Sequence, residues 1–250
     1  MRIRVEPFTV GDFIHAYNRG NRKMIVFRDI NDKWRFLKIL RFFNDQYSLP
    51  NPSRQIERNV GVRPQQLPQQ LPTGEFKWPE WPKTWPPHQP LVKILSYCLK
   101  DNHFHLLLKE ITAGGISQFM KKLGDGFTNY SNLKYDEVGR VFQGGYRGKT
   151  AMRDVRILQY LDAYVQVLNP FEDYPGGIGG VLKEFDKAFE FALQNPFCSL
   201  GESFGKRNLG IIERDVLGEM FPDVEVYKKF AYDALLVRNV REILGKLTLE

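Results

Sequence analysis

Two apolar runs separated by three polar residues constrain the fold of this chain more than any other feature. Residues 91–99 and 103–108 are almost continuously apolar, and Lys100, Asp101 and Asn102 lie between them. Short apolar runs joined by a tight polar connection predict an antiparallel β-hairpin. Because neither run alternates with polar residues, we expect both strands to be covered on both faces and to lie centrally in a sheet.

Further strands and helices are predicted on either side of this hairpin. Residues 13–18 form a candidate strand that ends in a turn at 19–21, and residues 139–149 form another with glycine kinks. Apolar residues at helical spacing predict three helices. The first is capped by Asn31 or Asp32 and reaches Tyr47, the second begins at 114–115, and the third covers 153–168 and is stopped by Pro170. This order predicts an α+β fold with helices packed on a small antiparallel sheet.

Residues 48–90 differ from the rest of the chain in composition. They contain ten of the 15 prolines and three tryptophans, Trp78, Trp81 and Trp85. Proline removes backbone donors and disfavours both helix and central strand, so we expect a long surface insertion. Its tryptophans either dock on the protein body, the use we favour, or stack on DNA bases.

The chain is therefore divided into a core domain over 1–170, which carries the Pro/Trp-rich insertion at 48–90, and a helical C-terminal accessory region over 171–250. Helices are expected there at 181–194, 211–220 and 224–247.

Charge and cysteine content narrow the functional classes. The net charge of +7 is compatible with an ordinary basic protein and also with a polyanionic partner such as nucleic acid. Cys98 and Cys198 are the only cysteines, which argues against a disulfide framework and fits a reducing cytoplasm. No stretch approaches the roughly 18 apolar residues that a membrane span requires. We expect a cytoplasmic protein that does not associate with membranes.

Two of the four histidines, His103 and His105, stand on the second strand of the predicted hairpin. Residues i and i+2 of a strand project from the same face, about 6.6–6.8 Å apart along the backbone. Two neutral imidazoles there can bind one divalent metal ion, while Phe104 points into the core. The alternative is a solvated or structural pair, but burying two polar rings in an apolar hairpin needs a reason.

The segment from Tyr97 to Leu108 resembles the HUH motif strand of single-tyrosine insertion-sequence transposases, and in particular that of REP-associated tyrosine transposases. Other stretches are similar to this family in the same order, which extends the resemblance over residues 13–170. They are 15–21 (HAYNRGN), 27–29 (FRD), 115–123 (GISQFMKKL), 141–147 (VFQGGYR) and 164–170 (YVQVLNP). The resemblance implies a ferredoxin-like HUH core, and the C-terminal region is similar to the tail seen in part of the family.

The resemblance also implies a chemistry. Enzymes of this family cleave and rejoin single-stranded DNA through a tyrosine nucleophile, leaving a 5′-phosphotyrosine intermediate and a free 3′-OH. By this resemblance Tyr164 is the nucleophile, and His103 and His105 hold Mg²⁺ or Mn²⁺, which polarises the scissile phosphate. The alternative for Tyr164 is a core tyrosine on an apolar helix face, and Tyr160, one turn earlier, is the reserve candidate.

One departure from the family pattern concerns the third metal ligand. The family usually carries Gln or Asn four residues after the tyrosine, whereas here Leu168 occupies that position and Asn169 follows it. On a regular α-helix Asn169 would point about 140° away from Tyr164. Pro170 disfavours the α conformation at Asn169, so unwinding or a bulge is needed to turn this side chain inward.

The implied partner is single-stranded DNA with hairpin-forming repeats, bound by a monomer or a homodimer. Arg19 and Arg147 are expected to contact phosphates, the alternative for each being a solvated surface charge. Two other functions stay open: a DNA-binding protein that does not cleave, and a small metal- or histidine-dependent hydrolase. A histidine-triad hydrolase would need a histidine where Leu107 stands, and no P-loop glycine motif is present.

Overall fold

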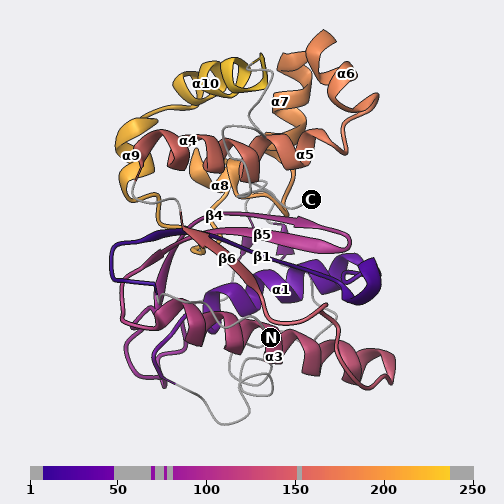
Figure 1. Cartoon of the computed structure of the whole chain (residues 1–250), viewed down its shortest axis with the longest axis vertical. Helices are drawn as coiled ribbons and strands as arrows, with labels where there is room; N and C mark the ends of the chain where they lie inside the picture. Colours follow the sequence, from indigo (N-terminus) through magenta and orange to yellow (C-terminus); the bar gives the residue numbers. More distant parts are fainter. Residues whose placement is uncertain (1–7, 48–68, 71–75, 78–80, 151–153, 237–250) are drawn as a thin grey trace.

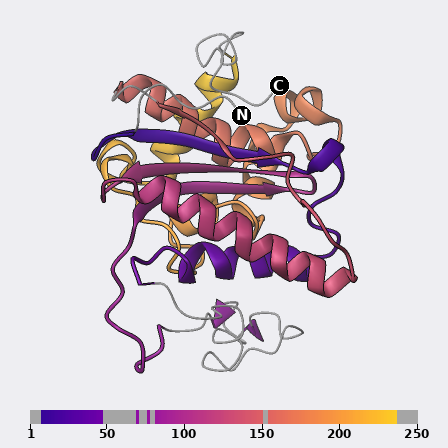
Figure 2. The same ribbon diagram turned by 60° about the horizontal axis from the view of Figure 1, so that its bottom comes forward.

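A four-stranded sheet separates two helical layers in the computed structural model, which describes residues 8–47, 69–70, 76–77, 81–150 and 154–236. Helices α1 (Ile30–Phe42) and α3 (Gly115–Tyr135) cover one face of the sheet, and the helices that follow residue 154 cover the other (Figure 1). Turning the molecule shows α1 and α3 side by side beneath the strands (Figure 2).

The sheet has the strand order β4-β5-β1-β6, and the paired strands are antiparallel. Its strands are β1 (Phe13–Arg19), β4 (Val92–Lys100), β5 (His103–Glu110) and β6 (Arg147–Thr150). With α1 after β1 and α3 after β5, this is the strand–helix–strand–strand–helix–strand arrangement of a ferredoxin-like core. The predicted α+β class and the predicted hairpin are both confirmed.

The position of β4 differs from the prediction. Only β5 of the hairpin lies inside the sheet, and β4 forms its edge. The free edge of β4 is nevertheless covered, because Leu99 N donates to Phe197 O (2.9 Å) and Ser199 N donates to Tyr97 O (2.9 Å). The continuous apolar run of β4 indicates a strand that is buried on both faces. In this fold β4 is buried in that way although it is an edge strand with only one neighbouring strand.

Alternation along β1 and β5 divides their side chains between the two layers. Phe104 and Ile14 belong to the apolar cluster that includes α1 and α3. Leu107 belongs to a second cluster, formed with the helices on the other side. His103, His105 and Leu107 share one face of β5, and their cross-strand partners on β1 face the same layer.

Several predicted boundaries are wrong. Strand β6 begins at Arg147 rather than at 139, and before it only Phe142 makes an isolated bridge, to Gly20. Gly139 has a φ of +105°, a left-handed conformation that interrupts regular strand geometry. Helix α1 is capped by Asp29, whose carboxylate accepts from Asp32 N in a reciprocal capping box, and it ends at Phe42.

Within the 48–90 insertion, the segment that carries Trp81 and Trp85 packs on α1. Trp85 is buried, and Trp81 stacks on Phe42 with ring centroids 5.8 Å apart. Trp81 also donates from Nε1 to Pro86 O (2.8 Å). Docking of the tryptophans is thus confirmed for Trp81 and Trp85, whereas Trp78 lies outside the described residues. Strands β2 (Gln69–Gln70) and β3 (Phe76–Lys77) form a separate two-stranded pair.

The second helical layer contains α4 (Val155–Ala163), a π-helical turn η2 (Tyr164–Leu168) and six further helices. These are α5 (Asn169–Phe171), α6 (Gly177–Lys183), α7 (Phe185–Gln194), α8 (Leu200–Ser203), α9 (Val216–Met220) and α10 (Val224–Leu236). The helix predicted over 181–194 corresponds to α6 and α7. The helix predicted over 211–220 is shorter and corresponds to α9. The helix predicted over 224–247 corresponds to α10 as far as residue 236, where the described residues end.

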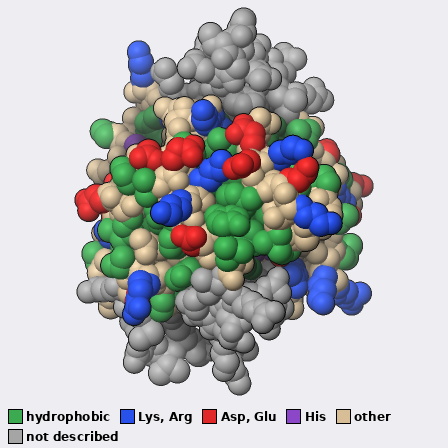
Figure 3. All heavy atoms as spheres, turned by 90° about the horizontal axis from the view of Figure 1, so that it is seen from above, with side chains coloured by type: hydrophobic (Ala, Val, Ile, Leu, Met, Phe, Trp, Pro, Cys, Tyr) green, Lys and Arg blue, Asp and Glu red, His purple; other side chains and the backbone are tan. Residues whose placement is uncertain are grey.

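Residues on both sides of 170 share the second apolar cluster, which joins Leu107 and Val165 to Phe189 and Leu217. The division of the chain at this point stays a prediction. Acidic and basic side chains are mixed over the described part of the outer face of this layer, so it presents no field of one sign (Figure 3). Among the described helices, none combines the length and apolar character needed to cross a membrane.

Candidate active site

Three cross-strand rows, whose members named here are polar except for Leu107, lie on the face of the sheet that looks toward α4 and η2. The register aligns Lys100 with His103 and His103 with Arg19 in the first row. It aligns His105 with Tyr17, and Tyr17 with Arg147, in the second. In the third, His15 pairs with Leu107 and Lys149. The fold thus gathers three histidines, a tyrosine and four cations from four strands, although β1 and β5 are about ninety residues apart in sequence.

His105 lies at the centre of this arrangement and is fully buried. Its Nδ1 is 2.9 Å from Nε2 of His15, and the two rings are stacked, with centroids 5.1 Å apart and planes 14° from parallel. The other ring nitrogen of His105, Nε2, is buried and has no hydrogen-bond partner among the described residues. A buried polar atom without a partner is rare, and an ion or a ligand that binds there is one explanation.

His103 is half-buried beside it, with the two ring centroids 5.0 Å apart and the planes nearly perpendicular. Its Nδ1 is 2.6 Å from Oδ1 of Asn102, and Asn102 Nδ2 donates to Lys23 O (3.3 Å), which orients this amide. Because an amide oxygen only accepts, Nδ1 of His103 carries the proton and Nε2 carries the lone pair. Both predicted ligands therefore have Nε2 as the nitrogen left to bind a metal ion.

Both histidines are neutral in this environment. Burial, followed by repulsion from Arg19 and Lys100, lowers the pKa of His103 to about 4. Burial, followed by the neighbouring His15 and His103, holds the pKa of His105 well below its usual value. Metal binding requires the neutral imidazole, so the surroundings keep the pair in the competent form at neutral pH.

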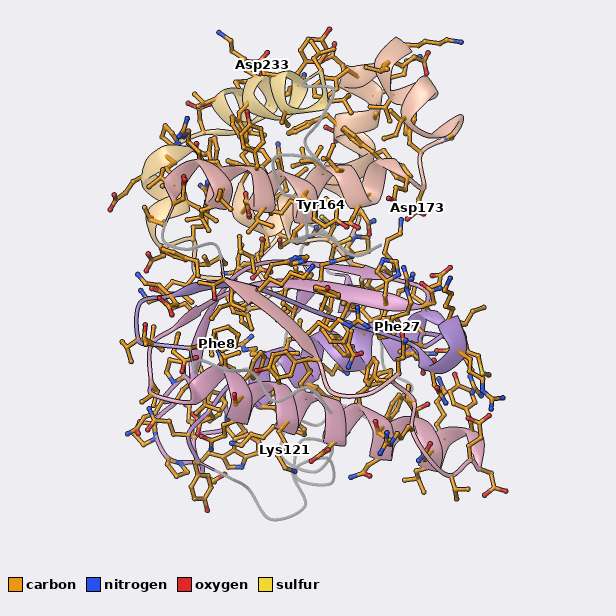
Figure 4. The ribbon with its side chains drawn as sticks, in the orientation of Figure 1. Phe8, Phe27, Lys121, Tyr164, Asp173 and Asp233 are labelled. Atoms are coloured by element: carbon orange, nitrogen blue, oxygen red, sulfur yellow. The ribbon has the colours of Figure 1, made fainter. Side chains whose placement is uncertain are left out.

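Tyr164 lies over these histidines as the first residue of η2, between the helical layer and the sheet (Figure 4). Its ring meets His105 edge to face at 5.3 Å and His15 at 5.8 Å. Tyr160, the reserve candidate, has its ring 5.4 Å from that of Phe230 on α10. The structure therefore brings Tyr164, and not Tyr160, to the predicted ligands, although Tyr164 is also 93% buried like a core residue.

The helix that carries Tyr164 does not stop before Pro170, contrary to the prediction. Asn169 has helical angles (φ −64°, ψ −49°), and its backbone N–H donates to Tyr164 O in an i to i+5 bond. A proline inside a helix has no N–H for the carbonyl four residues earlier and its ring clashes with it, so a widened turn accommodates Pro170. The Gln166 carbonyl that loses this donor accepts a hydrogen bond from Cys198 Sγ (2.9 Å) instead.

The widened turn also changes the direction of Asn169. Five residues make about one turn of a π-helix, so Asn169 returns toward the side of Tyr164 instead of pointing away from it. Its Nδ2 donates to Tyr164 O (2.7 Å), and Lys100, the cross-strand neighbour of His103, donates from Nζ to Asn169 O (2.8 Å). The amide oxygen Oδ1 is the atom of this side chain left for a ligand.

Arg19 and Arg147 line the same pocket, whose volume is about 260 Å³. Arg19 is half-buried, its Nε has no hydrogen-bond partner among the described residues, and Arg147 is exposed. The rest of the lining comprises Tyr17, Asn18, Lys23, Gln143, Gly144 and Gly145. The two predicted cations are therefore brought together with a third, Lys23, in a pocket whose lining does not include His103, His105 or Tyr164. Strand pairing links this pocket to the histidines, because Arg19 lies opposite His103 and Tyr17 lies opposite His105.

Several site residues were missed in the sequence. His15, Tyr17 and Arg19 follow the same i, i+2 spacing on β1 that His103 and His105 show on β5. That alternation could have placed His15 and Tyr17 on the site face. Nothing local indicated Lys100, which reaches the site only through strand pairing.

Comparison with known proteins adds one structural similarity. No family model matches the chain, and no curated protein matches it. At 12% identity and a TM-score of 0.45, the similarity found carries no argument about function, which has to come from the side chains. It is to a solved structure of the REP-associated tyrosine transposase bound to a REP hairpin, and it covers 86% of this chain and 90% of that chain.

Proposed function

We propose that this protein is a metal-dependent enzyme that nicks and rejoins single-stranded DNA through a covalent bond between Tyr164 and a 5′-phosphate. The observation that carries the proposal is the position of Tyr164, whose ring lies 5.3 Å from that of His105. His105 pairs across the sheet with Tyr17, and Tyr17 lines a pocket together with Arg19 and Arg147. A hydroxyl nucleophile, two neutral nitrogen ligands and phosphate-binding cations are the components that such a transfer needs.

The residues present fit a divalent metal ion such as Mg²⁺ or Mn²⁺. Nε2 of His105 is buried without a partner, and Nε2 of His103 carries a lone pair. Among the described residues, no group of three or more His, Cys, Asp or Glu side chains is arranged to hold a metal ion. We therefore assign the third protein ligand to Oδ1 of Asn169. A bound metal ion would supply a Lewis acid that stabilises charge on the phosphate.

The remaining roles belong to this chain. Arg19, Lys23 and Arg147 bind the phosphate backbone in the pocket beside the histidines. Tyr164 Oη gives up its proton and forms a bond to phosphorus, while the bond from phosphorus to the 3′ oxygen breaks and that oxygen takes up a proton. The energy of the phosphodiester is kept in the phosphotyrosine bond, so rejoining requires no external energy source.

The test is covalent capture of the DNA. The full chain is incubated with end-labelled single-stranded hairpin oligonucleotides and Mg²⁺ or Mn²⁺, and products are separated under denaturing conditions. We expect a protein–DNA adduct that EDTA abolishes and that mass spectrometry locates on Tyr164. Absence of an adduct with every hairpin and both metal ions would contradict the proposal.

One observation favours a second candidate, a protein that binds DNA hairpins on the same site without cleaving them. Tyr164 is only 7% exposed, and the Asn169 amide already donates to its carbonyl oxygen. Under this alternative the hairpin binds equally well with EDTA and no adduct forms, so the same experiment separates the two functions.

A further inference from the structure

His15 has no role in the chemistry described above, although it is fully buried at the centre of the site. Its Nε2 lies 2.9 Å from Nδ1 of His105 with the two rings almost parallel. Two ring nitrogens at this distance share one proton, since a hydrogen bond needs one donor and one acceptor. The direction of that bond determines which nitrogen of His105 carries a lone pair.

The two directions have different consequences at Nε2 of His105. If His15 donates, Nδ1 of His105 is the acceptor and its Nε2 carries a hydrogen, buried without any acceptor among the described residues. If His105 donates, its Nε2 carries a lone pair instead. Arg19 and Lys100 lie opposite His103 on the two neighbouring strands, on the face that His105 shares, and positive charges near this ring favour the lone pair over the N–H.

We infer that His15 is a positioning residue that accepts a hydrogen bond from Nδ1 of His105, and so fixes this ring in the tautomer whose Nε2 can bind a metal ion. The inference rests on the proposed function. Partners of this kind behind a ligating histidine typically change metal affinity about 10- to 100-fold when they are lost.

A neutral acceptor suits this position better than the carboxylate that often orients a ligating histidine. The site has to admit an anionic phosphate next to Arg19 and Arg147. A carboxylate at residue 15 would place a negative charge against His105 and within the same sheet face. Histidine accepts the hydrogen bond and adds no charge, so the pocket keeps its positive potential.

The first measurement uses metal-free full-length protein labelled with ¹⁵N at histidine. Long-range ¹H–¹⁵N correlation spectra distinguish protonated from unprotonated ring nitrogens. We expect His105 to be protonated at Nδ1 and unprotonated at Nε2 in the wild type, and to redistribute toward the Nε2-protonated form in His15→Leu. A wild-type spectrum with His105 protonated at Nε2 would overturn the inference.

The second measurement is the affinity for Mn²⁺ by isothermal titration calorimetry. We expect about 10- to 100-fold weaker binding in His15→Leu and partial recovery in His15→Gln, whose amide oxygen can accept the same hydrogen bond. His88→Leu is the matched control, because His88 lies outside the site, with Nε2 2.7 Å from Asn44 O. Unchanged affinity in a folded His15→Leu would overturn the inference. If that variant fails to fold, the inference is tested by the Mn²⁺ affinity of His15→Gln and by the tautomer of His105 in the wild-type spectrum.

Failure of the inference and failure of the proposed function are distinguishable. A wild type that forms the Tyr164 adduct while His15→Leu keeps the wild-type tautomer contradicts only the role of His15. A wild type with the expected tautomer and His15-dependent Mn²⁺ binding, but with no adduct, contradicts only the nicking activity.

Discussion

Tyr164 occupies a position in which packing and chemistry place different demands on one side chain. Its ring contacts His15 and His105 and belongs to the second apolar cluster, whereas only its hydroxyl is needed for a bond to DNA. Ring and hydroxyl can be separated experimentally, because phenylalanine keeps the first and lacks the second.

Tyr164→Phe is expected to abolish the covalent adduct while hairpin binding persists, since the phosphate contacts do not involve the tyrosine hydroxyl. The melting temperature should change little. Adducts are scored on denaturing gels and binding by fluorescence anisotropy. Tyr160→Phe is the matched control, because Tyr160 lies one turn earlier on the same helix and its ring packs against Phe230. An adduct that is lost in Tyr160→Phe and kept in Tyr164→Phe would show that the wrong tyrosine was assigned.

His103 and His105, the two proposed metal ligands, differ in burial, so we expect their removal to lower the stability of the fold by different amounts. His103→Ala should abolish the adduct with little loss of stability, because His103 is half-buried. His105→Ala should abolish it as well and also destabilise the fold by about 1–3 kcal/mol, because a fully buried ring is removed and His15 loses its partner. Urea denaturation provides the stability comparison. Full adduct formation by His103→Ala would contradict its role as a ligand.

At the scale of elements, α4 carries a buried carboxyl group, Asp162, two residues before η2 begins at Tyr164. Both of its oxygens accept from Gln166 Nε2 (2.8 Å each). The hydroxyls of Ser96 and Tyr227 approach it and favour its charged form, but neither makes a hydrogen bond of normal geometry. Burial dominates and raises the pKa of Asp162 to about 6.

This raised pKa predicts how stability depends on pH. Between pH 3.8 and about 6 the carboxyl group binds its proton more strongly in the folded protein than in the unfolded chain. Its contribution to the free energy of unfolding is therefore fully present below pH 3.8 and is lost as the pH rises through 6. The difference is on the order of 3 kcal/mol. Asp162→Asn should therefore be more stable than the wild type at pH 8 and similar to it at pH 3.5, measured by urea denaturation. If the free energies of unfolding of Asp162→Asn and the wild type differ by the same amount at both pH values, Asp162 is not the titrating group.

Elements that follow from a local sequence pattern were predictable, whereas elements whose geometry depends on how the packed chain accommodates one residue were not. The hairpin of β4 and β5 follows from two apolar runs and a polar turn, and the strand order then follows the common topology of such a core. A bulge or unwinding before Pro170 was named from the sequence as the way to turn Asn169 inward, but the continuation of the helix through Pro170 was not predicted. The role of His15 was not predicted, because it depends on the strand pairing that brings this residue 2.9 Å from His105, ninety positions away in the sequence.

At the scale of the whole molecule, the cations of the site face predict the salt dependence of DNA binding. Each phosphate contact to a single strand contributes about 0.7 to the slope of log K against log salt concentration. Arg147→Ala should weaken hairpin binding and reduce this slope by about that amount, whereas Lys187→Ala, on the distant helix α7, should not. Anisotropy titrations at several salt concentrations provide the slopes. Equal slopes for both variants would exclude Arg147 from the interface.

The shared apolar cluster predicts the outcome of truncation. A chain that ends at residue 170 exposes Leu95, Leu107 and Val165, which pack with residues of α7 and α9. We expect it to aggregate or to lose cooperative unfolding, as judged by size-exclusion chromatography and thermal denaturation. A soluble 1–170 fragment with a sharp transition would instead support the division of the chain into a core domain and an accessory region.

The covered edge of β4 has a consequence for biosynthesis. The strand is complete once residue 100 has been made, but its outer edge is closed by Phe197 and Ser199, which leave the ribosome about a hundred residues later. Throughout that interval the nascent chain carries an apolar strand with unpaired backbone groups, the kind of edge that recruits other strands. During this period β4 is an exposed edge strand, and a chain whose synthesis ends between residues 100 and 197 is expected to aggregate.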